Sequence, residues 1–264
     1  MFKKDVIRLV LFLFFAAGNV AEFDDNCNFD RYTNSIFSIT IGAISRIGKH
    51  PIYSEKCSGL LAVTYSSGSG DAIRTTDLGE SGCYSHFGGT SAAAPLGADI
   101  FALALEIRPD LTWRDMQYII MNSAVPVDNE GDRQTTSAGK LFSHTYGYGK
   151  TDSFQLITTA ISWKTVKPQS WLVSPWIYVS KDIPEDGNSL LSAFQVTVEM
   201  LQEANLEAVE HVTVTMNVKY GRRGDLLVDL ISPGNVVSHI AAVCRGDDSI
   251  EGYDNWTFMS VAYW

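Results

Sequence analysis

The first apolar run of the chain covers residues 9–17 and follows the basic residues Lys3 and Lys4. A basic start before a short apolar run is typical of a signal peptide, and the run is too short to span a bilayer comfortably. An unbroken apolar run is equally typical of a strand that is buried inside a parallel sheet. The hydrophobic pattern alone leaves both interpretations open.

The next segments predict a mixture of strands and helices. Residues 35–44 are β-branched and aromatic, which predicts a strand, and residues 57–70 predict a strand with turns. Residues 92–106 are almost continuously apolar, which predicts a helix that is buried on most sides within a large domain. A capping-box pattern at Thr112 predicts a second helix to about residue 122, and the polar residues 125–140 predict a loop.

After about residue 163 the pattern changes to alternation of apolar and polar residues with a period of two. Such alternation predicts short strands, and several of them with turn signals between them predict a β-sandwich. The predicted strands cover residues 171–173, 177–179, 194–198, 212–218 and 226–231. We therefore expect an α/β region before residue 163 and an all-β region after it.

Composition narrows the possible partners and metals. The apolar fraction is 45% and the charged fraction 19%, so the chain is expected to fold. A net charge of -10 argues against a nucleic-acid partner and is compatible with a partner rich in Lys and Arg. The four cysteines form no C-x-x-C pair, which makes a zinc site unlikely, and they fit either disulfides in a secreted protein or free thiols.

Ser91 opens the predicted apolar helix and has two possible roles. A serine at a helix start is often an N-cap, whose hydroxyl accepts a backbone N–H. It is alternatively a nucleophile, because its small neighbours admit a substrate and the helix N-terminus offers N–H groups to a developing oxyanion. The residues alone do not separate these roles.

The segment Gly89-Thr-Ser-Ala-Ala-Ala-Pro95 resembles the nucleophile motif of subtilases. Further segments make the chain similar, from about residue 12 to residue 264, to kexin- and furin-like proprotein convertases. In the first region they are residues 25–30, 32–36, 53–57, 64–68, 111–118 and 146–149, and in the tail 210–214, 222–225, 230–233 and 256–261. The resemblance implies the C-terminal part of a subtilisin-like α/β parallel-sheet domain at residues 1–162. An incomplete all-β, jelly-roll-like P domain would follow at residues 163–264.

The resemblance also implies site residues. Ser91 corresponds to the nucleophile, and Asn19, in Ala16-Ala-Gly-Asn19, to the asparagine of the oxyanion hole; this register favours the buried-strand interpretation of residues 9–16. Asp30 corresponds to the carboxylate that binds the P1 basic side chain. Asp25 and Glu55 correspond to calcium ligands, although without the resemblance all three acids would be taken for solvated surface groups.

The cysteines and one asparagine carry further expectations. Cys27 and Cys57 occupy the positions of a family disulfide, whereas Cys83 is expected to be a free thiol and Cys244 has no evident partner. Asn255 begins an Asn-x-Thr glycosylation sequon, but it lies in a predicted strand, which makes its use doubtful.

The chain departs from the family in ways that affect activity. The resemblance places the triad Asp and His far upstream of Asn19, in segments that do not occur there, and His86, the histidine nearest to Ser91 in sequence, corresponds to a structural position. Loss of triad members lowers kcat by roughly 10⁶-fold in subtilisin. Arg31 replaces a glycine beside Asp30 and is expected to compete for that carboxylate, while Asp99 places a carboxylate in the predicted buried helix.

Two functions follow from these expectations. In the first, the protein is a kexin-like serine endopeptidase that cuts precursor proteins after paired basic residues. It would need calcium, and it would act in the late Golgi or be secreted. This chain alone would then be inactive, and attached to a membrane only if a longer chain carries an anchor. In the second, it is a non-catalytic secreted remnant or interaction module with a β-sandwich P domain.

Overall fold

The computed structural model of the chain describes residues 12–127, 132–184 and 187–264. It divides into two compact units. The larger unit comprises Met1–Val166 with Glu210–Trp264, and the smaller unit comprises Lys167–Val209.

A three-stranded parallel sheet forms the centre of the larger unit. Its strands are β1 (Leu13–Ala16), β2 (Ser38–Ile44) and β3 (Leu60–Tyr65), in that order across the sheet. Both predicted strands, at residues 35–44 and 57–70, are confirmed. The first apolar run forms β1 at the sheet edge, where it is half-buried rather than fully buried; residues 9–11 of that prediction lie outside the described residues.

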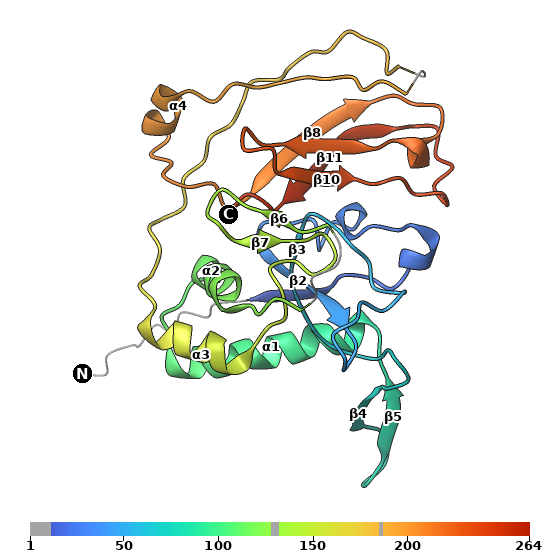
Figure 1. Cartoon of the computed structure of the whole chain (residues 1–264), viewed down its shortest axis with the longest axis vertical. Coiled ribbons are helices and arrows are strands. Elements are labelled where there is room, and N and C mark those ends of the chain that lie inside the picture. The colour runs from blue at the N-terminus through green and yellow to red at the C-terminus, as the bar shows by residue number, and fades with distance from the viewer. Residues whose placement is uncertain (1–11, 128–131, 185–186) are drawn as a thin grey trace, which may run out of the picture. The chain divides into compact units, whose positions relative to one another are not determined.

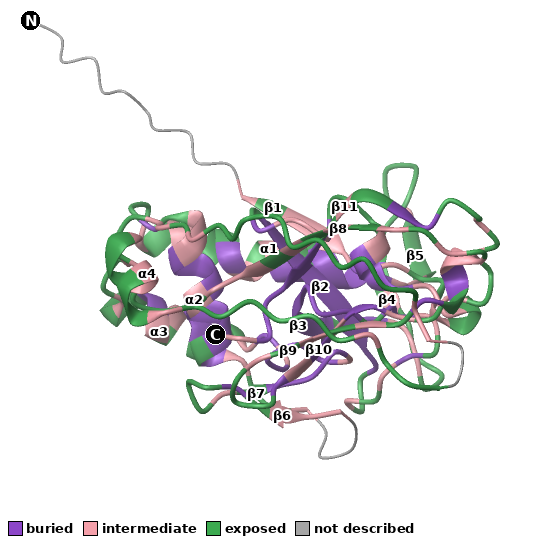
Figure 2. Ribbon diagram, turned by 90° about the horizontal axis from the view of Figure 1, so that it is seen from above, coloured by how far each residue is buried: buried purple, intermediate pink, exposed green. Residues whose placement is uncertain are grey.

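Three helices lie on one side of this sheet (Figure 1). They are α1 (Thr90–Ile107), α2 (Trp113–Ser123) and α3 (Ser153–Ser162), and α1 packs against all three strands. Figure 2 shows the buried residues concentrated in β2, β3 and the sheet-facing side of α1. The larger core cluster joins this sheet and these helices to the end of the chain at Trp264.

Helix α1 is buried on one face only, so the expectation of burial on most sides is wrong. Ala93, Gly97 and Ala104 are buried and allow the helix backbone to approach the sheet closely. On the other face Leu103 and Ile107 are 49% and 48% exposed. Within the described ranges α1 is also the one helix long and apolar enough to cross a membrane, but its packing along the sheet identifies it as a core helix.

The capping box of α2 is confirmed, because the Thr112 hydroxyl accepts from the Asp115 N–H (3.2 Å) while Asp115 accepts from the Thr112 N–H (2.8 Å). The predicted loop at 125–140 contains the short strand β6 (Gln134–Thr135), which pairs with β7 (Leu141–Phe142). Helix α3 was not predicted, nor was the hairpin of β4 (Ile73–Thr76) and β5 (Cys83–Phe87), which projects from the sheet in Figure 1.

The C-terminal part of the larger unit is all-β. Strand β8 (Val212–Val218) pairs with β11 (Tyr253–Ser260), and β9 (Val228–Ile231) pairs with β10 (Val237–Ala241), all antiparallel, so the two predicted strands here are confirmed. These strands dock on the α/β part through buried hydrogen bonds: Asn28 Nδ2 donates to Ile240 O (3.0 Å), and Tyr148 Oη donates to Val261 O (2.6 Å). Three short 3-10 helices complete the larger unit: η1 (Ala21–Phe23), η2 (Cys27–Phe29) and η3 (Arg223–Asp225).

The smaller unit has no strand among its described residues, and its helix α4 (Val198–Glu203) is short. The predicted strands at 171–173, 177–179 and 194–198 are therefore wrong. Their apolar side chains are exposed, as for Val173 (81%) and Tyr178 (89%), and no neighbouring strand provides hydrogen bonds to them.

Candidate active site

Ser91 lies in the first turn of α1, one residue after the helix begins at Thr90. The N-cap is Gly89, whose φ of 73° is in the left-handed region that glycine tolerates, and the cap uses no side-chain hydrogen bond. The interpretation of Ser91 as an N-cap is therefore wrong. Its side chain is exposed and has no hydrogen-bond partner among the described residues, which leaves the hydroxyl accessible at a helix N-terminus.

Asn19 contacts the residue directly before Ser91. Its Oδ1 accepts from both the backbone N–H (2.8 Å) and the hydroxyl (3.0 Å) of Thr90, and the Thr90 hydroxyl in turn accepts from the N–H of Gly18 (3.2 Å). Because the Thr90 N–H can only donate, these bonds fix which end of the Asn19 amide faces Thr90. The Nδ2 group therefore points away from Thr90 with its donors available beside the start of α1.

The turn before the nucleophile is held by the end of β3, which the sequence analysis did not predict. The Ser66 hydroxyl donates to Gly89 O (2.6 Å), and the Ser67 hydroxyl accepts from the Gly89 N–H (3.2 Å). Tyr53 Oη donates to Ser67 O (2.7 Å). A Cβ atom at Gly88 would lie 2.0 Å from the Ser67 hydroxyl, so this approach also requires glycine. Both backbone groups of the cap residue are thus fixed.

No histidine contacts Ser91 in the described structure. His86 is exposed on β5 and packs on Tyr84, with 5.9 Å between ring centroids. His50 packs edge-on against Tyr146, and burial lowers the pKa of His50 to about 4. The structure therefore shows no imidazole that could accept the proton of the Ser91 hydroxyl.

One group in the larger unit has the residue types of a catalytic triad but the wrong connections. His144 Nδ1 lies 2.7 Å from Asp132, and the Ser143 hydroxyl donates to Asp132 (2.6 Å) instead of to the histidine. His144 Nε2 accepts from the backbone N–H of His239 (3.0 Å) in β10, so both ring nitrogens are occupied. Burial opposes ionisation of Asp132, but the hydrogen bonds from His144 and Ser143 hold its pKa well below the usual range. This group joins β10 to the α/β part and activates no nucleophile.

The three predicted acids lie in one neighbourhood. Asp30 is exposed after η2, where its Oδ1 accepts from the N–H of Tyr32 (2.6 Å). Glu55 is 5% exposed, and its Oε1 accepts from the N–H of Val20 (3.1 Å). Burial raises the pKa of Glu55 to about 7, and the charges of Asp25 and Asp30 contribute to this increase.

Two of these acids, Asp25 and Glu55, are the predicted calcium ligands. Asp25 and Glu55 offer hard oxygen donors, and their repulsion is of the kind that a cation relieves. A Cβ atom at Gly18 would lie 2.2 Å from the Glu55 carboxyl carbon, so the backbone beside this carboxylate is closely packed. Over the described ranges, no three His, Cys, Asp or Glu side chains form a metal cluster. Calcium takes about 6–8 oxygen ligands, so these residues fit only part of its coordination shell.

The expected disulfide joins the loops that carry these acids. Cys27 and Cys57 are bonded, with 5.3 Å between their Cα atoms and 30 residues between them. Cys83 is free and exposed, and Cys244 is free and half-buried, as expected.

Two expectations about interfering residues are not met. No hydrogen bond or ion pair joins Arg31 to Asp30 in the described structure; Arg31 instead lines a hollow beside β11. Asp99 lies on the exposed face of α1, so its carboxylate remains in water and carries no burial penalty.

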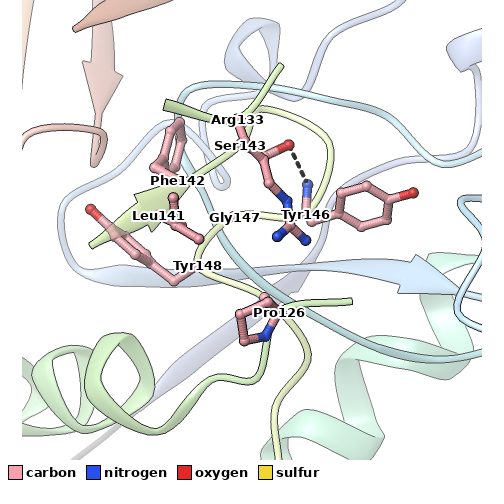
Figure 3. A pocket seen from close by; sticks show the side chains of 9 residues that line it. Pro126, Arg133, Leu141, Phe142, Ser143, Tyr146, Gly147 and Tyr148 are labelled. Atoms are coloured by element: carbon pink, nitrogen blue, oxygen red, sulfur yellow. Dashed lines mark hydrogen bonds between the residues drawn. The ribbon is translucent and has the colours of Figure 1, made fainter. Parts of the chain in front are cut away.

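A hollow near the C-terminal end of the α/β part is too small for a substrate. Its volume is about 10 Å³, which is room for about one water molecule. Figure 3 shows it beside the Tyr146 N–H, which donates to the Ser143 hydroxyl (3.3 Å). Its lining residues are Pro126, Arg133, Leu141, Phe142, Ser143, Tyr146, Gly147, Tyr148 and Gly149, none of them a predicted site residue.

Comparison with known proteins identifies both parts of the chain. Residues 4–149 match the family model described as the Subtilase family, and residues 209–264 match that of the proprotein convertase P-domain. Protease KEX1 of Kluyveromyces lactis is 51% identical over 251 residues, which cover 95% of this chain and 33% of that protein. Furin of Rattus norvegicus is 40% identical over 94% of this chain and 31% of its own length.

A solved structure supports the fold. The serine protease of Aeromonas sobria matches with a TM-score of 0.70 and 21% identity, over 91% of this chain and 50% of that chain. The chain spans about a third of the length of the curated relatives it matches. It belongs to the subtilase family of serine endopeptidases, in the kexin- and furin-like branch that carries a P domain.

Proposed function

We propose that this chain supplies the nucleophile and the oxyanion donor of a kexin-like endopeptidase that cuts precursor proteins after paired basic residues. The observation that carries the proposal is the pair of hydrogen bonds from Thr90 to Asn19 Oδ1. They hold the Asn19 amide beside the start of α1, where Ser91 is exposed. A nucleophile next to a fixed N–H donor is the geometry that acyl transfer requires.

The reaction assigns a separate task to each group. Ser91 Oγ attacks the scissile carbonyl carbon, and the carbonyl oxygen becomes an oxyanion that accepts from Asn19 Nδ2. The hydroxyl proton must pass to a base, and no histidine contacts Ser91 within the described ranges. We therefore expect the chain alone not to turn over substrate.

The acids account for the proposed preference. Asp30 is exposed, and its second carboxylate oxygen has no hydrogen bond in the described structure, which suits a basic P1 side chain. The relative from Schizosaccharomyces pombe, 45% identical over 257 residues, is named a dibasic-processing endoprotease. A net charge of -10 also favours encounter with basic segments.

Calcium, location and domain limits belong to the same proposal. Asp25 and Glu55 would hold part of a calcium shell, whose charge would keep Glu55 ionised. The Cys27–Cys57 disulfide fits an oxidising compartment, so we place the protein in the late Golgi or outside the cell. We assign residues 1–162 to the subtilisin-like domain and 163–264 to the P domain.

The test uses the chain alone and a hybrid protein. Assayed on a fluorogenic Lys-Arg peptide with calcium, the chain alone is expected to show no turnover. In the hybrid, residues 12–264 replace the matching segment of the Kluyveromyces lactis relative, and turnover is expected. Asn19→Ala should lower kcat of the hybrid about 10²- to 10³-fold, because one oxyanion donor is lost.

Controls separate the outcomes. Ser91→Ala should abolish turnover by the hybrid, whereas Asp99→Asn, on the exposed face of α1, should leave it unchanged. Asp30→Asn should raise KM for the basic peptide. A folded hybrid that is inactive with Ser91 intact would refute the proposal and favour the second function, a non-catalytic secreted module. This second function is supported by the position of Ser91, which has no imidazole partner in the part of the chain that the structure describes.

A further inference from the structure

Asn255 begins the single Asn-x-Ser/Thr sequon of the 264-residue sequence, formed with Trp256 and Thr257. Its position in a strand would normally argue against use, because a strand residue has neighbours on both sides. The structure removes that objection. Strand β11 changes register between Tyr253 and Trp256, which is the mark of a β-bulge.

Because of the bulge, Asn255 is not part of the hydrogen-bonded pairing between β11 and β8. Its φ of 48° is in the left-handed region, which asparagine tolerates better than most residues, and its backbone N–H donates to Asn217 Oδ1 (2.7 Å) instead of to a strand. Its side chain is exposed, and its amide has no hydrogen bond in the described structure. The acceptor nitrogen Nδ2 is therefore free in the folded protein.

The surroundings can accommodate a sugar chain. Asn255 lines a hollow of about 440 Å³, to which Arg31, Asn34 and Ser35 contribute polar groups. The outward residues of β8 beside it, Thr213, Thr215 and Asn217, are exposed and polar. A hydrophilic glycan here would find hydrogen-bonding groups, and the half-buried ring of Trp256, which also lines the hollow, offers a face on which a sugar ring can pack.

We propose that Asn255 carries an N-linked glycan, an inference that rests on the secretory location in the proposed function. The donor is a lipid-diphosphate-linked oligosaccharide of that pathway. A bond forms between Asn255 Nδ2 and C1 of the first sugar, the bond from C1 to the diphosphate oxygen breaks, and one amide proton is released. Transfer takes place on the extended chain, before the Thr257 hydroxyl bonds to that of Thr215 (2.8 Å).

The position of the glycan has a consequence for the substrate side. Arg31 lines the same hollow and directly follows Asp30, the proposed binding group for the P1 side chain. The glycan would therefore lie close to the loop that selects substrates, and the guanidinium of Arg31 can donate to sugar oxygens.

The test is expression of the chain behind a heterologous secretory signal peptide in yeast, followed by immunoblotting with and without endoglycosidase H. The expected result is one shifted species that the enzyme returns to the unmodified mobility. Asn255→Gln and Thr257→Ala should each remove the shift, and Thr257→Ser should keep it, because serine also completes a sequon.

A second acceptor makes a negative result decisive. In an Asn255→Gln background, Glu207→Thr completes a sequon that begins at Asn205, which is exposed with a φ of 51°. This double variant should be shifted, which shows that the chain enters the lumen. An unshifted wild-type chain beside a shifted double variant overturns the proposal. The hybrid peptidase assay does not depend on the glycan, so failure here is distinguishable from failure of the proposed function.

Discussion

The strands β8 to β11 pair with one another through their backbones, whereas the segments of Lys167–Val209 have no strand partner in the described chain. Strand β8 pairs with β11 over most of its length, and Phe258 in β11 is fully buried between the rings of Phe29 and Tyr253. In the smaller unit Val173, Trp176 and Tyr178 are exposed by 81%, 58% and 89%, and no strand pairs with them in the described chain.

The difference shows that alternation of apolar and polar residues does not by itself produce a strand. An apolar face contributes free energy, about 25 cal/mol per Å² removed from water, only when another surface covers it. Strand β8 has a partner about 40 residues later in the sequence, and its apolar face is half-buried, whereas its polar face is exposed. We therefore expect substitutions in β11 to have large effects on stability and substitutions in the smaller unit to have small ones.

The largest effect is expected for Phe258→Ala. Removal of a fully buried ring leaves a cavity, which should lower the free energy of unfolding by about 3–5 kcal/mol. Trp176→Ala, in the smaller unit, should change it by no more than about 0.5 kcal/mol. Urea unfolding monitored by circular dichroism measures both, and equal losses would contradict the comparison.

An ion pair in each region gives the second prediction. Arg114 of α2 pairs with Glu210, just before β8, and both side chains are 12% exposed; Tyr118 Oη also donates to Glu210 (3.0 Å). Glu210→Ala removes both carboxylate oxygens that bond to the Arg114 guanidinium and should cost about 3 kcal/mol of unfolding free energy. Glu207→Ala breaks the Lys167–Glu207 pair, whose side chains are 71% and 66% exposed, and should cost at most about 0.5 kcal/mol. If both variants unfold at the same urea concentration, the larger unit does not depend on the Arg114 pair.

The smallest effect is a pH dependence from His211. Its Nε2 is buried without a partner in the described structure, and its ring lies between those of Trp113 and Trp264. Burial lowers the pKa of His211 from 6.5 to about 4, so the unfolded state binds the proton more tightly and stability falls as pH falls through this range. From pH 7 to pH 5 the loss from this group should be about 2 kcal/mol.

The matched variants for this prediction are His211→Phe and His86→Phe. The first should unfold with a weaker dependence on pH between 7 and 5, whereas the second, at an exposed site on β5, should behave as the wild type does. Thermal unfolding at the two pH values is the measurement. An unchanged pH dependence in His211→Phe would show that the ring is not held neutral by burial.

Much of the fold was predictable because local signals agree with the tertiary contacts. Strands β2 and β3 are buried β-branched runs, and the capping box at Thr112 and Asp115 is a local hydrogen-bond pattern. The exposed face of α1 was not predictable, because Leu103 and Phe101 have the same character in sequence and differ only in which side the sheet covers. The three strands expected in the smaller unit failed for the same reason, since pairing depends on distant residues.

The site was predictable only in part. Ser91 and Asn19 were predicted only through resemblance to a motif. No local pattern indicates that Gly18 and Thr90, which are 72 positions apart, share a hydrogen bond. The roles of Ser66 and Ser67 in holding Gly89 were missed, because small polar residues after a strand read simply as a turn. Glu55 resembled a surface acid, and only its burial reveals a carboxylate with a raised pKa.

The bond between Cys27 and Cys57 also has a consequence for the unfolded chain. In the denatured protein it keeps the loop that bears Asp30 and the one that bears Glu55 tethered within a ring that also contains β2. On dilution from denaturant, Asp30 and Glu55 therefore have only a short distance to search before they meet. Treatment with dithiothreitol before refolding should lengthen that search. It should also lengthen the path between Asn19 and Ser91, because the bond lies between them in the sequence and bypasses the loop of 30 residues that separates the two cysteines.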